Sequence, residues 1–171
     1  MPTYKLIDTK TVTSNTNTVS FTSIPDTYTD LVLWISARNA QNNYGGFFMY
    51  FNNTYSGMTY RFMRGYDTSS TQTGVQSSTV DVMQFPISGD TANTFSNAEV
   101  YITQYSSNAK TKFYRADSAR ITPNITSNGG SIRMANGRWD STAVINRVDL
   151  FTDTDNFLTG SKFWLYGIKN S

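Results

Sequence analysis

The sequence predicts an all-β protein, a two-sheet antiparallel sandwich, and two observations carry this prediction. Apolar and polar residues alternate with a period of two along the chain, and clusters of turn-forming residues break the alternation about every ten residues. Only 15% of the 171 residues are charged, well below the usual roughly 25%. Ser, Thr, Asn and Tyr take their place, and these residues suit strands and turns.

The strands follow from the alternation, which is clearest where four apolar residues face one way, at Leu31, Leu33, Ile35 and Ala37. The intervening Val32, Trp34, Ser36 and Arg38 face the other way. The same pattern, with varying clarity, predicts eleven strands, which in chain order are Tyr4–Ile7, Thr18–Thr22, Leu31–Arg38, Phe47–Asn52, Thr59–Met63, Thr79–Met83, Ala98–Thr103, Lys112–Ala116, Ser131–Ala135, Val144–Leu150 and Lys162–Gly167.

Turn formers separate these strands and leave no segment that reads as a linker between domains. The main clusters are Asn39–Gly46, Tyr66–Gly74, Ser88–Thr94, Asn124–Gly130 and Asp153–Gly160. No segment combines a 3.6-residue period with helix caps, so we expect at most one helical turn, at Pro25–Thr29 or Asp90–Thr94. We therefore expect residues 1–171 to form one sandwich domain.

Some strands carry large aromatic residues on both faces. Between Phe47 and Phe51, one face can fill the core while Phe48 and Tyr50 still point the other way. Two explanations are open for this second face. Either a long loop covers it, or it forms an oligomer or partner interface, since aromatic residues are enriched at interface centres.

Composition excludes several classes of function. The chain has no His and no Cys, which rules out Ser-His-Asp and Cys-His catalysis, disulfides, and metal sites built on imidazole or thiolate. Its net charge is +2 with no run of Lys or Arg, so we expect no nucleic-acid partner. No apolar window is long enough for a membrane helix or a signal peptide, so we expect no membrane association and no ordinary secretion.

The remaining acid–base candidates are the carboxylates of Asp140, Asp149, Asp153 and Asp155, all near expected turns. A glycosidase needs two carboxylates converging across a cleft, and turn positions do not predict such a pair. The run Asp153-Thr154-Asp155-Asn156 lacks the central Gly and the Glu of a calcium-binding EF-hand loop, and turn chemistry accounts for it. We expect no enzyme activity, no cofactor and no metal.

Trp139 is the best local candidate for a sugar-binding residue, because Arg138 and Asp140 flank it. The alternative is that Trp139 packs at the end of the sandwich.

After the opening Tyr4–Ile7, three further stretches carry a family resemblance: Phe21–Leu31 (FTSIPDTYTDL) leading to Ser36–Arg38, Asn93–Ile102 (NTFSNAEVYI) and Leu165–Lys169 (LYGIK). In this order they resemble a group of small virion structural proteins of tailed bacteriophages. The resemblance implies a jelly-roll-like domain that is assembled in the host cytoplasm and displayed on the virion. It implies a capsid cement (decoration) protein that binds the major capsid protein, or a tail-fibre or receptor-binding domain that recognises host-surface carbohydrate. The short chain, which lacks a repetitive shaft, favours cement.

A cement subunit is expected to be a homo-oligomer, most simply a trimer, because a trimer meets three equivalent lattice sites at once and gains avidity. The segment Met1–Asp8 is either an arm that reaches the capsid or the first strand of the sandwich. Its apolar residues Tyr4, Leu6 and Ile7, together with Phe48, Tyr50 and Trp139, are the candidate partner-binding residues.

Overall fold

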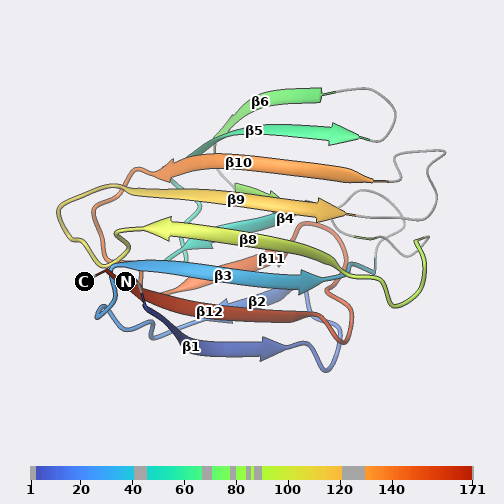
Figure 1. Ribbon diagram of the computed structural model, residues 1–171, viewed down its shortest axis with the longest axis horizontal. Helices are drawn as coiled ribbons and strands as arrows, with labels where there is room; N and C mark the ends of the chain where they lie inside the picture. The colour runs from blue at the N-terminus through green and yellow to red at the C-terminus, as the bar shows by residue number, and fades with distance from the viewer. Residues whose placement is uncertain are drawn as a thin grey trace.

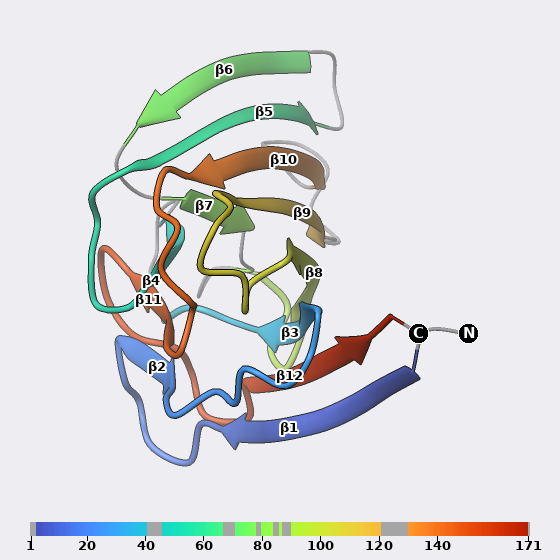
Figure 2. The ribbon, with the colours of Figure 1, turned by 90° about the vertical axis from the view of Figure 1, so that its left-hand side faces the viewer.

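The protein is an all-β sandwich of two antiparallel sheets, one of eight strands and one of four. The computed structural model describes residues 3–40, 46–66, 71–77, 80–83, 86, 90–120 and 130–170. The eight-stranded sheet lies in front in Figure 1, with the smaller sheet behind it. Figure 2 shows the two layers from the side. The described residues include no helix, and thus none long and apolar enough to cross a membrane.

The chain passes repeatedly between the two sheets, as in a jelly roll. The strands are β1 (Thr3–Thr11), β2 (Thr18–Phe21), β3 (Asp30–Ala37), β4 (Phe47–Phe51), β5 (Met58–Tyr66), β6 (Thr71–Ser77), β7 (Val80–Met83), β8 (Ser96–Thr103), β9 (Lys112–Arg120), β10 (Ser131–Trp139), β11 (Val148–Thr152) and β12 (Lys162–Lys169). The large sheet has the order β1-β12-β3-β8-β9-β10-β5-β6, and the small sheet has the order β2-β11-β4-β7.

Two expected elements differ from the structure. The strand expected at Val144–Leu150 begins only at Val148, because the side chain of Asn52 holds the preceding residues in a loop. Its Nδ2 donates to the Val144 carbonyl at 2.8 Å, and its Oδ1 accepts from the backbone N–H groups of Asn146 and Arg147 at 3.0 and 3.1 Å.

The other difference is β6, which lies partly within the turn expected at Tyr66–Gly74. Strand β5 extends to Tyr66 and pairs with β6 from Thr71 onward, and residues 67–70 lie outside the described part of the chain. Most of the turns expected at 39–46 and 124–130, residues 88–89 of the turn at 88–94, and Thr79 of the expected strand Thr79–Met83 also lie outside it.

The core lies between the sheets and is filled by one face of β2–β5 and β7–β12, as the alternation predicts. On β3, Leu31, Leu33 and Ala37 are completely buried, and Ile35 is 2% exposed. At one end of the core Phe47, Phe157 and Phe163 pack together, with the ring of Phe157 5.4 and 5.2 Å from the other two. Edge-to-face aromatic packing of this kind adds to the stability gained from apolar burial.

Residues 3–8 of the N-terminal segment belong to the first strand of the large sheet. Strand β1 pairs with β12 from Thr3↔Lys169 to Thr11↔Lys162, and a β-bulge interrupts the register at Ile7. The opposite side of β1 is an edge of the sheet. Lys5, Lys10 and the bulge break up this edge, and such features protect exposed edges from pairing with other chains.

Candidate functional site

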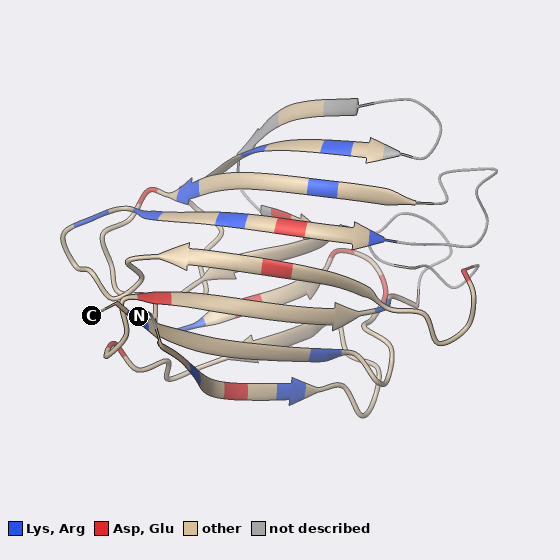
Figure 3. Ribbon diagram, in the orientation of Figure 1, with Lys and Arg blue, Asp and Glu red and all other residues tan. Residues whose placement is uncertain are grey.

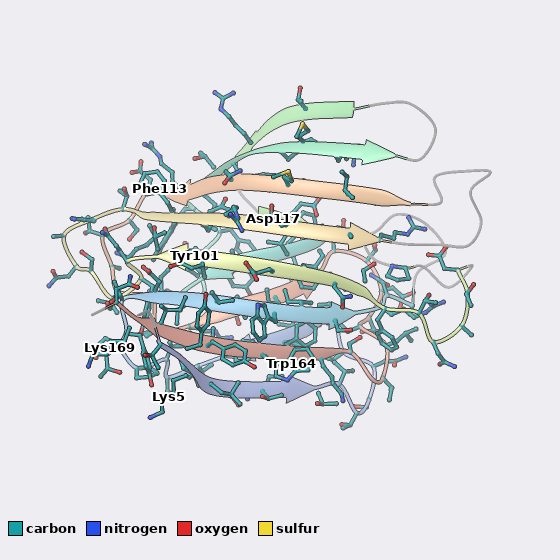
Figure 4. The ribbon with its side chains drawn as sticks, viewed as in Figure 1. Lys5, Tyr101, Phe113, Asp117, Trp164 and Lys169 are labelled. Carbon is teal, nitrogen blue, oxygen red and sulfur yellow. The ribbon has the colours of Figure 1, made fainter. Side chains whose placement is uncertain are left out.

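The candidate site is the outer face of the eight-stranded sheet, meaning the face turned away from the four-stranded sheet. Because the strand register is continuous, the outward side chains form transverse rows across the sheet. From β1 to β6 the central row reads Thr9, Trp164, Trp34, Glu99, Asp117, Met134, Met63 and Thr73. Figure 4 shows Trp164 and Asp117 on this face.

This outer face carries an unusual amount of exposed apolar surface. Among the described residues, eight large hydrophobic side chains are exposed, and seven of them project from it: Tyr4, Leu6, Trp34, Met63, Phe113, Ile132 and Met134. The eighth, Tyr55, lies in the loop after β4. Single exposed hydrophobic residues are common, but a concentration of them on one face marks an interaction surface.

Figure 3 marks the charged residues along the chain, and two carboxylates lie together near the centre of this face. Glu99 on β8 and Asp117 on β9 are direct cross-strand neighbours. The Trp34 indole Nε1 donates to Glu99 Oε2 at 3.0 Å. Arg115 Nε lies 2.7 Å from Asp117 Oδ2, whereas Arg115 Nη2 lies 3.7 Å from Glu99 Oε1. Arg115 therefore pairs closely with only one of the two carboxylates.

A groove of about 830 Å³ crosses the outer face over β8 and β9. Trp34 and Trp164 form one wall and Ile132 and Met134 form the other, with Asn97, Ala119 and the two carboxylates along the floor. The groove exists because short side chains on the two central strands lie between tall side chains on their neighbours.

One side of this face is held firmly by aromatic packing. The rings of Trp34 and Tyr166 lie 4.6 Å apart at 56°. Further along β8, the Tyr101 hydroxyl donates to the buried carboxylate of Asp30 at 2.8 Å. Burial, together with this hydrogen bond, raises the pKa of Tyr101 to about 12, so its hydroxyl stays protonated and keeps donating at neutral pH.

Of the partner-binding candidates predicted on the first strand, two lie on the outer face. Tyr4 is 53% exposed and Leu6 is 49% exposed. Ile7 occupies the β-bulge and packs against the core, where it is half-buried.

Phe48 and Tyr50 lie on the outside of the four-stranded sheet, away from the groove. Tyr50 is 7% exposed, because the ring of Tyr55 covers it at 4.3 Å. Phe48 is half-buried and packs on Phe151 at 5.3 Å. Of the two explanations for the second face of this strand, the covering loop applies to Tyr50, because the loop that carries Tyr55 packs over it.

Trp139 ends β10 and is buried at the end of the sandwich, as the alternative interpretation expects. Its Nε1 donates to the Ser56 carbonyl at 3.2 Å, and its ring meets Phe51 edge to face at 5.6 Å. Arg138 and Asp140 are exposed beside it. An indole buried in this way offers no stacking surface to a sugar.

Three of the four carboxylates considered as acid–base candidates are held in structural contacts, while Asp140 is exposed, with Arg138 Nη2 3.6 Å from its Oδ2. Asp149 is completely buried, and its oxygens accept from Arg147 Nε at 2.9 and 2.8 Å and from Ser20 Oγ at 2.6 Å. Asp153 and Asp155 lie in the turn after β11, where each accepts a backbone N–H. No group of three acidic residues in the described ranges is placed to hold a metal ion.

Four residues of the groove, Trp34, Trp164, Ile132 and Met134, are absent from the set of predicted site residues. For the two tryptophans the sequence did contain a signal for an outward position, since the alternation assigns both to the face opposite the core. For Ile132 and Met134 no face was assigned, because the apolar signal of the predicted strand Ser131–Ala135 is weak.

The fold and this face together define an all-β sandwich with one broad face on which exposed apolar side chains are concentrated. No family model, no curated protein and no solved structure matches the chain.

Proposed function

We propose that this chain is a non-enzymatic virion structural protein, a cement (decoration) protein that binds and stabilises a bacteriophage head through the outer face of its large sheet. The observation that carries the proposal is the concentration of seven exposed apolar side chains on that single face. The resemblance to virion proteins of tailed bacteriophages is the reason for proposing a phage head, and the major capsid protein is the proposed partner.

The size of the outer face supports a stable protein contact. Eight strands at about 4.8 Å spacing, each with four outward residues about 6.8 Å apart, cover roughly 1,000 Å². A standard protein interface buries about 800 Å² on each partner. Contacts made through the apolar residues of this face would depend on shape and apolar burial.

On the capsid we propose a homo-oligomer, most simply a trimer, in which several weak contacts act together. Analytical ultracentrifugation of the purified chain and imaging of decorated particles would establish the subunit number. A chain that stays monomeric both in solution and on capsids would refute the oligomer.

The direct test of the function is to mix purified chain with capsids that lack it and to measure the bound copies. Ile132→Asp places a charge at the most exposed apolar position of the outer face. It should weaken binding about tenfold or more, the usual effect of losing an interface hot spot. Tyr55→Asp is the matched control, because Tyr55 is the exposed large residue that lies off this face.

Circular dichroism should show that both variants remain folded. Equal loss of binding in the two variants would contradict the assignment of the outer face. Absence of binding by the unmodified chain would contradict the cement function itself.

The alternative, a tail-fibre or receptor-binding domain that recognises host-surface carbohydrate, is favoured by one observation. Trp34 and Trp164 lie beside Asn97 and Glu99 in the groove, and aromatic rings next to polar side chains suit sugars. The number of copies per virion separates the two functions, since cement is present in hundreds of copies and a tail protein in a handful.

A further inference from the structure

We propose that the groove over β8 and β9 receives a basic side chain, preferentially arginine, from an apolar segment of a partner protein. This inference rests on the proposed function, because it takes the outer face as the partner-binding surface, and it specifies the chemistry of the segment that binds there.

The shape of the groove suits a single long side chain or one extended strand. Its walls stand on β3 and β10, three strand spacings or about 14 Å apart from backbone to backbone. Trp34 on one side and Met134 on the other reach into this space from the central row, over the short side chains of Asn97 and Ala119. What remains between the walls is an open groove that is lined mainly by apolar surface.

The floor of this groove carries more negative than positive charge. Glu99 and Asp117 are directly opposite each other on neighbouring strands, and like charges in this position destabilise a sheet. Arg115 Nη2 lies 3.7 Å from Glu99 Oε1, beyond hydrogen-bond distance. Arg133 also lines the groove, but its Nη1 pairs with Asp81 Oδ2 at 2.8 Å. Asp117 Oδ1 is buried without a hydrogen-bond partner. A partner cannot reach this buried atom, but the Glu99 side chain is 44% exposed, and its Oε1 can accept from a further donor.

An arginine side chain matches both parts of the groove. Its aliphatic stem can lie along the apolar walls while the charged end reaches the carboxylates. A guanidinium group also stacks on aromatic faces such as the Trp34 indole, and it binds carboxylates with two parallel hydrogen bonds. Lysine offers only a compact charge with neither the planar stacking nor the paired geometry, so arginine should be preferred.

The groove favours a protein segment over a carbohydrate. Ile132 and Met134, which form the wall opposite the indoles, offer a sugar no hydrogen bonds. Glu99 Oε2 already accepts from Trp34. Methionine and aromatic side chains are characteristic of protein interface cores.

The experiment titrates the full chain with three capped tripeptides, acetyl-Leu-Arg-Leu-amide and its Lys and Gln counterparts, at low salt. Tryptophan fluorescence is the readout. Of the three tryptophans, Trp139 is buried, so a change on titration reports Trp34 and Trp164. The Arg peptide should bind about tenfold more tightly than the Gln peptide, with the Lys peptide between them. The Arg preference should shrink as salt is added.

The double variant Glu99→Gln/Asp117→Asn should lose the preference for the Arg peptide. Asp140→Asn/Asp155→Asn is the matched control, because it removes the same charge from two exposed carboxylates outside the groove and should keep the preference. Thermal melts verify folding, and the salt dependence of the unmodified chain provides a second measurement that needs no variant.

Equal affinity for the Arg and Gln peptides, or loss of the preference in the control variant, would overturn the inference. A saturable response to chitohexaose without one to the Arg peptide would overturn it in favour of carbohydrate. Capsid mixing is independent of this test. A chain that decorates capsids without preferring arginine refutes only the groove assignment, and one that prefers arginine without decorating capsids refutes only the cement function.

Discussion

Leu33 is the residue whose truncation should most directly test the assignment of the sheet faces. It lies at the middle of β3, is completely buried, and is flanked in the register by Leu165 of β12 and Val100 of β8, which are also completely buried. Leu33→Ala removes the larger part of a side chain from a site enclosed on both sides. The neighbours are fixed in the sheet and cannot collapse fully into the space, so a cavity remains.

The expected loss in the free energy of unfolding is about 2–5 kcal/mol, in the upper part of this range because the position is enclosed. For a chain of this size, each kcal/mol lowers the melting temperature by about 2–4 °C, so a decrease of about 10 °C is expected. Urea unfolding followed by circular dichroism gives the free energy, and the slope with urea should be unchanged.

Leu6→Ala is the matched control, because it makes the same substitution at a position of the same sheet that is 49% exposed. It should cost well under 1 kcal/mol, as surface substitutions usually do. A Leu33→Ala protein as stable as the unmodified chain, or a Leu6→Ala protein destabilised to the same extent, would mean that the two faces of the large sheet are assigned wrongly.

Two further perturbations test the space between the sheets. Burial raises the pKa of Asp81 from 3.8 to about 6, although Arg133 Nη1 lies 2.8 Å from its Oδ2. The folded chain therefore binds the Asp81 proton more tightly than the unfolded chain does. The melting temperature of the unmodified chain, relative to that of Asp81→Asn, should rise as the pH falls from about 7 to 4. A melting-temperature difference that stays constant across this range would refute the raised pKa of Asp81. A Cβ at Gly137 would lie 2.1 Å from the Tyr114 hydroxyl, so Gly137→Ala should cost about 1–3 kcal/mol in chemical unfolding, while the exposed Asn136→Ala should be near neutral. Equal stability of these two variants would show that the close approach at Gly137 is absent.

The sequence alone determined the fold class and the inward face of the clearest strands. A period of two is a local property, because successive side chains of a strand must point to opposite faces. Leu31, Leu33 and Ile35 could therefore be placed in the core before any contact was known. The weaker cases were misplaced where distant side chains intervene, as at Val144, which Asn52 holds in a loop.

Only the tertiary structure decided which outward faces remain open. The alternation treats Tyr50 and Trp34 alike, as aromatic residues opposite the core face, yet Tyr55 covers Tyr50 while Trp34 stays 41% exposed. It also could not place Glu99 beside Asp117 or either of them beside Trp34. Glu99 and Asp117 lie on consecutive strands, whereas Trp34 lies 65 residues before Glu99. Their meeting depends on strand order and register, which no local pattern determines.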